Sequence, residues 1–167
     1  RLIFRTSMNP YKPFGSLASP EHGQAGRKIG EEGIVLLQNK DNVLPIDLKK
    51  ARKIAVIGEN AIKMMTVGGG SSSLKVKYEI SPLDGLKNRV GSQAEVLYAR
   101  GYVGDPTGEY NGVQTGQDLK DDRSEDELLA EAVEVSKDAD YVIFFGGLNK
   151  SNHQDCEDSD RASLGLP

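Results

Sequence analysis

A short run of apolar residues, KIAVIG at positions 53–58, narrows the possible folds of this chain more than any other stretch. A strand with one face in water alternates apolar and polar residues, whereas a strand covered on both faces is apolar almost throughout. The run therefore predicts a strand that is buried on both faces. Two further runs, AEVLYARG at 94–101 and DYVIFFGG at 140–147, predict a second and a third strand.

Helix signals separate these three runs. Ser81-Pro82 and Ser124 are typical helix starts, because serine caps the first N–H groups and proline fits the first helical position. Glu127, three residues after Ser124, completes a capping box. The apolar positions that follow these starts are Leu83, Leu86 and Val90 in one segment and Leu128, Leu129, Ala132, Val133 and Val135 in the other. The order strand, helix, strand, helix, strand predicts an α/β three-layer sandwich with a mostly parallel sheet and helices on both faces.

The N-terminal part carries different signals. Three prolines fall within the first 20 residues, so residues 1–19 are expected to form an extended tether. A helix is predicted to begin at Ser19-Pro20. The run GIVLLQN at 33–39 is rich in branched aliphatic residues and predicts a further short strand.

Composition and charge exclude several classes of protein. The 167 residues suffice for one domain with a sizeable core, and 37% hydrophobic content with 19 glycines indicates a folded protein with generous loops. A net charge of −4 argues against a nucleic-acid partner, which requires a basic face. No apolar run approaches the roughly 18 residues of a membrane span. The single cysteine excludes an internal disulfide.

Long loops follow the predicted strands. In a parallel sheet the loops that leave the carboxyl ends of the strands share one edge, and ligands bind there. The predicted loops are 59–80, 102–123 and 148 onward, all longer than the roughly 2–6 residues that are usual between strand and helix. The sequence therefore places the GGGSSS stretch at 68–73 and the acidic stretch at 153–167 on one edge.

The glycine stretch does not match a nucleotide-binding motif. A dinucleotide fingerprint needs G-x-G-x-x-G directly between strand and helix, whereas here Gly58 ends the strand and the next glycines come ten residues later. A Walker lysine pattern is also missing from the sequence. Two interpretations stay open for residues 68–73: a flexible loop, or a loop whose small residues let backbone and hydroxyl groups approach a polyol.

The acidic stretch invites a metal-site interpretation that its spacing does not support. Asp155, Glu157 and Ser159 alternate as in a calcium loop, but Asp160 stands where such a loop needs glycine, and Leu166 stands where it needs glutamate. Calcium is therefore disfavoured.

Zinc and cysteine chemistry are also poorly supported. Zinc would need His153, Cys156 and two more ligands, and the remaining histidine, His22, is distant in sequence. A nucleophilic Cys156 paired with His153 would lack a third, orienting group. A run of charges is most often a solvated face. Its position on the ligand-binding edge argues for a function instead.

Six segments in order carry a family resemblance. The segments EEGIVLLQNKDNVLPI, KIAVIGENA, GGGSSS, ISPLDGL, VIFFGGLN and CEDSDRASLGLP resemble glycoside hydrolase family 3. They are similar to the first half of its second domain, an α/β sandwich that follows a catalytic barrel in β-glucosidases and β-xylosidases. The resemblance implies that residues 1–20 are a linker from a barrel outside this chain. It also implies that residues 21–167 are part of the sandwich domain.

The resemblance assigns a role to the acidic stretch. In this family the general acid/base is a glutamate in an E-G-x-D-R segment, and the matching residue here is Glu157. Asp158 stands where the pattern has glycine. A general acid must hold its proton near neutral pH, and neighbouring carboxylates such as Asp155, Asp158 and Asp160 raise a carboxyl's pKa. Arg161 would oppose them, and we expect Asp160 and Arg161 to pair and brace the loop.

The implied activity is that of a retaining β-glycosidase of the β-glucosidase type, which hydrolyses terminal non-reducing β-linked sugars. The family's nucleophile is an aspartate of the barrel, so this chain alone is expected to be inactive. The residues that the resemblance places against the sugar are Ser71, Ser72, Asn149, Lys150 and His153.

The resemblance also implies partners and excludes others. The expected partners are a β-linked oligosaccharide or glycoside, the N-terminal barrel and the remainder of the sandwich domain; no cofactor, metal, nucleic acid or membrane is expected. The chain begins with Arg1 rather than Met, which is expected of a mature or excised start, and localisation is open, with export to the periplasm or medium favoured by the family. The alternative is a non-catalytic carbohydrate-binding or scaffold α/β domain, and a nucleotide binder is more distant. A nucleophilic aspartate encoded upstream would distinguish the enzyme.

Overall fold

The computed structural model describes residues 2–9, 15–66, 71, 76–104, 119–150, 154–157 and 159–166. The chain divides into two compact units, residues 1–41 and residues 42–167, and each is considered by itself. Within the described ranges, no helix combines the length and apolarity needed to cross a bilayer.

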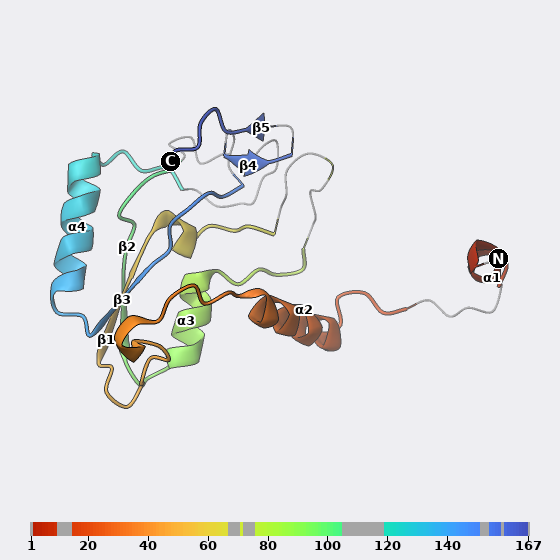
Figure 1. The fold of residues 1–167 in the computed structure, drawn as a ribbon, viewed down its shortest axis with the longest axis horizontal. Coiled ribbons are helices and arrows are strands. Elements are labelled where there is room, and N and C mark those ends of the chain that lie inside the picture. The colour runs from red at the N-terminus through yellow and green to blue at the C-terminus, as the bar shows by residue number, and fades with distance from the viewer. Residues whose placement is uncertain are drawn as a thin grey trace. The chain divides into compact units, whose positions relative to one another are not determined.

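The second unit is built on a three-stranded sheet (Figure 1). Its strands are β1 (Lys53–Ile57), β2 (Glu95–Ala99) and β3 (Tyr141–Phe144), in the order β2-β1-β3. Both neighbours pair with β1 in parallel, and Ile54 lies opposite Val96 on one side and Tyr141 on the other. The prediction of a parallel sheet and of a strand at 53–58 buried on both faces is confirmed, and the structure adds that this strand is the central one.

Two helices cover opposite faces of this sheet, α3 (Pro82–Val90) and α4 (Glu125–Lys137). Side chains of β1 alternate between the two faces, as the pleat of a strand requires. Ile54 and Val56 share a buried cluster with Leu83 of α3, whereas Ile57 packs with Ala132 of α4. Figure 1 shows the sheet between the two helices, so the predicted three-layer arrangement is confirmed.

Both helices begin where the serine signals predict. The Ser81 hydroxyl accepts a hydrogen bond from the Asp84 backbone N–H at 3.1 Å. At the start of α4, the Ser124 hydroxyl accepts from the Glu127 N–H at 3.3 Å, and a Glu127 carboxylate oxygen accepts from the Ser124 N–H at 2.8 Å. The capping box is therefore complete, and it satisfies N–H groups that the first helical turn leaves without partners.

The first unit contains two helices, α1 (Leu2–Ser7) and α2 (Pro20–Gly33). The start of α2 is confirmed, because Ser19 caps it and proline occupies its first turn. The extended tether is wrong for Leu2–Ser7. Proline restricts its own φ and the residue before it, so the prolines further along the chain do not constrain these six residues. Residues 10–14 lie outside the described part.

The strand predicted at 33–39 is also wrong. Gly33 ends α2, and residues 34–39 form no regular element before a short 3-10 turn, η1 (Lys40–Asn42). Branched aliphatic residues favour a strand only when a neighbouring strand supplies hydrogen-bond partners and a surface to pack against. Among the described residues, sheet pairing involves only β1, β2, β3 and a short hairpin near residue 157.

The turn that ends β1 depends on glycine. Gly58 has φ +125°, and a Cβ added there would lie 2.2 Å from the carbonyl oxygen of Phe145. We expect Gly58→Ala to lower the free energy of unfolding by about 2 kcal/mol or more, because the strained φ and the backbone overlap must both be relieved. Urea denaturation of the purified protein measures this loss.

Gly85→Ala is the matched control. Gly85 lies inside α3, and a Cβ there would meet only the Ile80 side chain at 3.8 Å. This variant should keep or raise stability, by up to about 1 kcal/mol from helix propensity. Equal urea midpoints for the two variants would contradict the backbone conformation at Gly58.

Candidate functional site

The carboxyl ends of the three parallel strands define the candidate site. The chain leaves β1 at Gly58, β2 at Arg100 and β3 at Phe145, and the parallel pairing brings these three exits to one edge. A short 3-10 turn, η2 (Glu59–Ala61), follows β1 there. Figure 1 shows strands β4 and β5 beyond the same end of the sheet.

Strands β4 (Asp155–Cys156) and β5 (Ser159–Asp160) form an antiparallel hairpin. Cys156 pairs with Ser159, and Glu157 directly follows β4, in the turn between the two strands. The hairpin places Glu157 at its tip, and Glu157 is exposed. Sequence reasoning expected a loop in this region and missed the hairpin, because strands this short carry no readable alternation.

Ser71 and Glu157 are in direct contact across the edge. The Ser71 hydroxyl donates to Glu157 Oε1 with an oxygen–oxygen distance of 2.6 Å, although the residues are 86 positions apart in the sequence. A hydroxyl donating to a carboxylate over this distance forms a short, charge-assisted hydrogen bond. The contact confirms that the loop after β1 and the segment after β3 share an edge.

A glutamate holds the base of the loop that carries Ser71. The Glu79 carboxylate accepts hydrogen bonds from the backbone N–H groups of Met65 and Thr66, the second at 3.0 Å, and from the Thr66 hydroxyl at 2.9 Å. These bonds join the outgoing and returning sides of the loop. The position of Ser71 is therefore restrained at the loop's base as well as at its contact with Glu157.

Charged residues are buried where β1 and β2 end. Glu59 has a fully buried side chain and accepts from Lys63 Nζ at 2.9 Å, from Arg100 Nη2 at 3.0 Å and from the Gly104 N–H at 2.9 Å. Lys63 is fully buried too, and Arg100 is nearly so. A buried carboxylate is stable only when donors replace its lost water, and these three donors do so. They tie the loop after β1 to the loop after β2.

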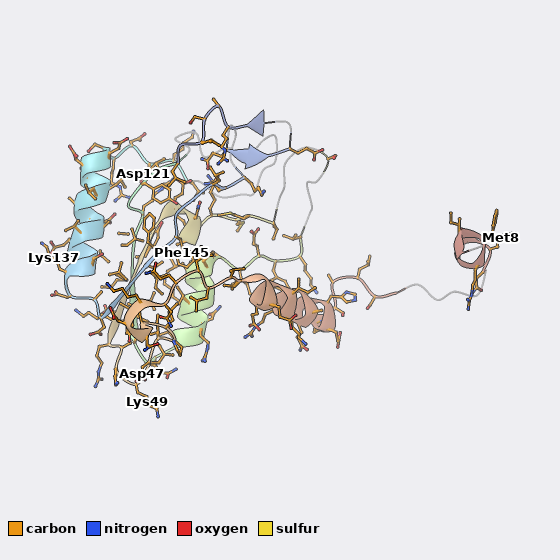
Figure 2. The ribbon with its side chains drawn as sticks, viewed as in Figure 1. Met8, Asp47, Lys49, Asp121, Lys137 and Phe145 are labelled. Atoms are coloured by element: carbon orange, nitrogen blue, oxygen red, sulfur yellow. The ribbon has the colours of Figure 1, made fainter. Side chains whose placement is uncertain are left out.

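Asp121 extends this network toward α4 (Figure 2). Its carboxylate lies 3.4 Å from Arg100 Nη1 and 2.7 Å from Arg123 Nη2, and Arg123 also contacts Glu131 of α4 at 2.7 Å. The hydrogen bonds from Arg123 hold the pKa of Asp121 well below its usual range. The end of the loop after β2 is therefore fixed to the helix that follows it.

Buried amide side chains link the three loops. Asn60 Nδ2 donates to the Gly147 carbonyl at 3.0 Å, and Asn149 Nδ2 donates to Asn60 Oδ1 at 3.0 Å. Gln154 accepts at Oε1 from the Asn149 N–H at 3.1 Å and donates through Nε2 to the Gly104 carbonyl at 3.0 Å. All three amide side chains belong to buried residues. The hairpin is thus connected to the loops after all three strands.

Two tyrosines support the strand exits. Tyr98 donates its hydroxyl to the Gly58 carbonyl at 3.3 Å, and Tyr102 donates to the Phe145 carbonyl at 2.8 Å (Phe145 is labelled in Figure 2). Burial raises the pKa of Tyr98 to about 12 and also raises the pKa of Tyr102. Both phenols therefore keep their protons, and their donor function, at neutral and mildly alkaline pH.

The predicted sugar-contact residues take different places. Ser71 is exposed beside Glu157, and Lys150 is half-buried in the segment after β3. Asn149 is only 2% exposed, and its amide contacts Asn60. Asn149 therefore supports the neighbouring loops in this structure, and its contact with a sugar stays a prediction.

The remaining predicted site residues are only partly described. Arg161 is exposed. The residues outside the described part are Ser72, His153 and Asp158. For Asp155 and Asp160 the structure describes only the backbone, in which the two residues pair across the hairpin. The pairing of Asp160 with Arg161 stays a prediction.

Sequence reasoning missed the buried polar residues that join the loops. Glu59, Asn60 and Arg100 were not singled out, nor was Gln154. A usable signal existed, because polar or charged residues follow each apolar run within a few positions, where parallel strands reach their common edge. Which of these side chains are buried depends on the packing of loops that are distant in sequence.

Fold and site together define an α/β sandwich domain that presents a carboxylate on a hairpin near the edge where the parallel strands have their carboxyl ends. The sequence model described as the Glycosyl hydrolase family 3 C-terminal domain matches residues 34–167. The chain belongs to glycoside hydrolase family 3 and carries part of its C-terminal domain, as the six sequence segments indicated.

Curated relatives agree with this assignment. The chain is 45% identical over 173 aligned positions to a β-glucosidase of Bacteroides ovatus, with 100% of the chain and 22% of the relative covered. It is 33% identical over 153 positions to a β-xylosidase of Formosa agariphila, with 87% and 18% covered. The chain thus spans about a fifth of the length of these relatives.

Solved structures show the same fold. The structure of a family 3 β-glucosidase from Bifidobacterium adolescentis superposes with a TM-score of 0.66 at 31% identity, covering 98% of this chain and 20% of that one. A β-glucosidase from Erythrobacter marinus gives a TM-score of 0.64 at 32% identity, covering 89% and 19%.

Proposed function

We propose that this chain supplies the acid/base carboxylate of a retaining β-glycosidase of the β-glucosidase type, and that Glu157 is that carboxylate. The observation that carries the proposal is the position of Glu157: exposed, at the tip of a hairpin on the ligand-binding edge, with Ser71 donating to it. The names of the relatives, β-glucosidase and β-xylosidase, support the reaction class. The substrate is a terminal non-reducing β-linked sugar.

The reaction assigns two tasks to one carboxyl group. In the first half, protonated Glu157 gives its proton to the glycosidic oxygen as the bond to the departing group breaks. In the second half, the carboxylate takes a proton from the water that releases the sugar from the enzyme. A side chain at an exposed hairpin tip can reach a bound substrate and exchange protons with solvent between turnovers.

Ser71 orients this carboxyl group. Its hydroxyl donates to Oε1, which restricts the rotation of the carboxyl plane. With Oε1 held in this way, the proton for the glycosidic oxygen is carried by Oε2. Ser71 therefore acts as an orienting partner of the acid/base in addition to its predicted contact with the sugar.

The nucleophile belongs to a part of the enzyme beyond these residues. A retaining glycosidase needs a second carboxyl group about 5–5.5 Å from the first. We assign this second carboxyl group to an aspartate of an N-terminal barrel domain. This chain then supplies Glu157 and one wall of the sugar-binding site. Ser72, Asn149, Lys150 and His153 are proposed to contact the sugar or its leaving group.

A comparison of the complete enzyme with the isolated chain tests whether the acid/base and the nucleophile come from different parts of the protein. The complete protein should hydrolyse 4-nitrophenyl β-glucoside or β-xyloside, because it holds both carboxyl groups. A purified chain of residues 1–167 should release no nitrophenol above the background rate. Turnover by the isolated chain that is lost on Glu157→Gln would overturn the proposal. An inactive complete protein that still binds the sugar would instead indicate a non-catalytic carbohydrate-binding domain.

A further inference from the structure

The hairpin that carries Glu157 is too small to hold its own position. Each of its strands has two residues, and the pairing consists of two opposed residue pairs. An isolated two-stranded hairpin is marginal in water even when it is longer. The direction in which Glu157 points must therefore be determined by contacts between the hairpin and the rest of the domain.

Gln154 provides such a contact at the base of the hairpin. It directly precedes β4, is 6% exposed, and uses both ends of its side-chain amide: Oε1 accepts from the Asn149 N–H and Nε2 donates to the Gly104 carbonyl. A buried amide with both ends bonded resists rotation, because any other rotamer would leave buried polar groups without partners.

The groups that Gln154 contacts are themselves fixed. Asn149 is joined to Asn60 immediately after β1, and Gly104 donates its N–H to the buried carboxylate of Glu59. Asn60 and Glu59 belong to η2, which starts where the central strand ends. The Gln154 amide therefore connects the hairpin to the end of the sheet by a short path of buried and partly buried hydrogen bonds.

We propose that Gln154 is a positioning residue for the acid/base Glu157, with the Asn60–Asn149 amide pair as its support. The proposal rests on the proposed function of Glu157 and assigns a role to a residue that does not touch substrate. Ser71 restrains the tip of the hairpin through an exposed hydrogen bond, whereas Gln154 restrains the start of β4 through one buried and one partly buried hydrogen bond. Loss of the Gln154 hydrogen bonds lets the hairpin change its orientation, and this moves the carboxyl group of Glu157 away from the glycosidic oxygen.

The test compares two leaving groups in the complete enzyme. Gln154→Ala should lower kcat/KM, which reports the first step, about tenfold on an unactivated disaccharide, because misplacing a catalytic group by about 1 Å can cost about 10²-fold in rate. The kcat/KM on a 2,4-dinitrophenyl glycoside, whose leaving group departs with little protonation, should fall less than about threefold. A purely structural loss would reduce the active fraction, and so both rates, equally.

A second variant keeps the test decisive if Gln154→Ala does not fold. Gln154→Met keeps the approximate size of the side chain, adds no charge, and removes both the acceptor for the Asn149 N–H and the donor to the Gly104 carbonyl. It should show the same unequal loss on the two substrates.

The matched control is Asp140→Ala. The Asp140 carboxylate accepts from the Arg52 and Lys53 N–H groups at 2.7 and 3.0 Å, where β1 and β3 begin, at the opposite edge of the sheet. Any loss in this control should be equal on both substrates.

Glu157→Gln in the same assay separates the two proposals. If Glu157→Gln shows the unequal loss and both Gln154 variants behave like Asp140→Ala, the positioning role is overturned and the function of Glu157 stands. If Glu157→Gln itself loses both activities equally, the proposed function fails and the positioning role fails with it. Unequal losses in Glu157→Gln and in either Gln154 variant support the positioning role.

Discussion

Replacing Glu157 with alanine in the complete enzyme should lower the rate on unactivated β-glycosides by about 10²–10⁴, the usual contribution of a positioned acid/base. The loss follows from two missing proton transfers, one to the departing oxygen and one from the attacking water. A substrate with an acidic phenol as leaving group needs little protonation, so its first step should be affected least. The values of kcat/KM on a disaccharide and on a dinitrophenyl glycoside report this first step and measure the difference.

Azide should restore turnover in this variant. Once the first step is fast and the second lacks its base, the covalent glycosyl-enzyme accumulates. A small anion fits the space that the Glu157 side chain vacates and attacks without losing a proton, so the product should be the β-glycosyl azide. Chromatography of the products and the rate as a function of azide concentration both report this outcome.

Neighbouring acids provide the controls for azide rescue. Asp155→Ala and Asp158→Ala remove carboxylates within two positions of Glu157 and should give no glycosyl azide. If Glu157→Ala retains near-normal activity on unactivated disaccharides, the assignment of the acid/base is wrong. Asp155, which lies in the same hairpin, would then be the first candidate to examine.

The second large effect concerns stability. Glu59→Ala should destabilise the second unit by about 3–5 kcal/mol, because it removes the carboxylate that contacts the buried cations of Lys63 and Arg100. This loss of unfolding free energy reflects the cost of leaving the Lys63 and Arg100 charges buried without the Glu59 carboxylate. It is larger than the net contribution of the ion pairs to stability. Hydrogen exchange of peptides covering β1 and β2 in the complete protein reports this unit separately from other domains.

A surface ion pair provides the matched control. Glu134→Ala is the same substitution at a site where the glutamate side chain is 71% exposed and its partner Lys137, labelled in Figure 2, is 60% exposed. Water and salt screen such a pair, so hydrogen exchange of β1 and β2 should not change measurably. If Glu59→Ala resembled this control, the buried position of Glu59 would be contradicted.

Local patterns were sufficient to predict much of the fold. The apolar runs, the serine caps at Ser81 and Ser124, and the alternation of strand and helix signals act over a few residues each, so they are readable from sequence. The run at 34–39 shows the limit of this reasoning. Its composition suits a strand, yet strand formation requires a partner that no local pattern supplies.

The candidate site, like the fold, could be predicted from the sequence only in part. Glu157 was identified through a motif of five adjacent residues, and its place on the loop edge followed from the parallel order of the strands. The hydrogen bond from Ser71, the buried carboxylate of Glu59 and the bridging amide of Gln154 did not follow from either. Each of these depends on which loops meet in three dimensions.

The residue proposed as the acid/base and the common edge of the loops could thus be predicted from the sequence, because the motif consists of adjacent residues and because strand–helix–strand order favours parallel pairing. The support of that carboxylate was decided by tertiary structure alone. Asn60 and Asn149 are 89 positions apart, and Gln154 and Gly104 are 50 apart. Whether such polar side chains meet, and whether water is excluded around them, depends on how the chain packs as a whole, and burial then makes their hydrogen bonds costly to break.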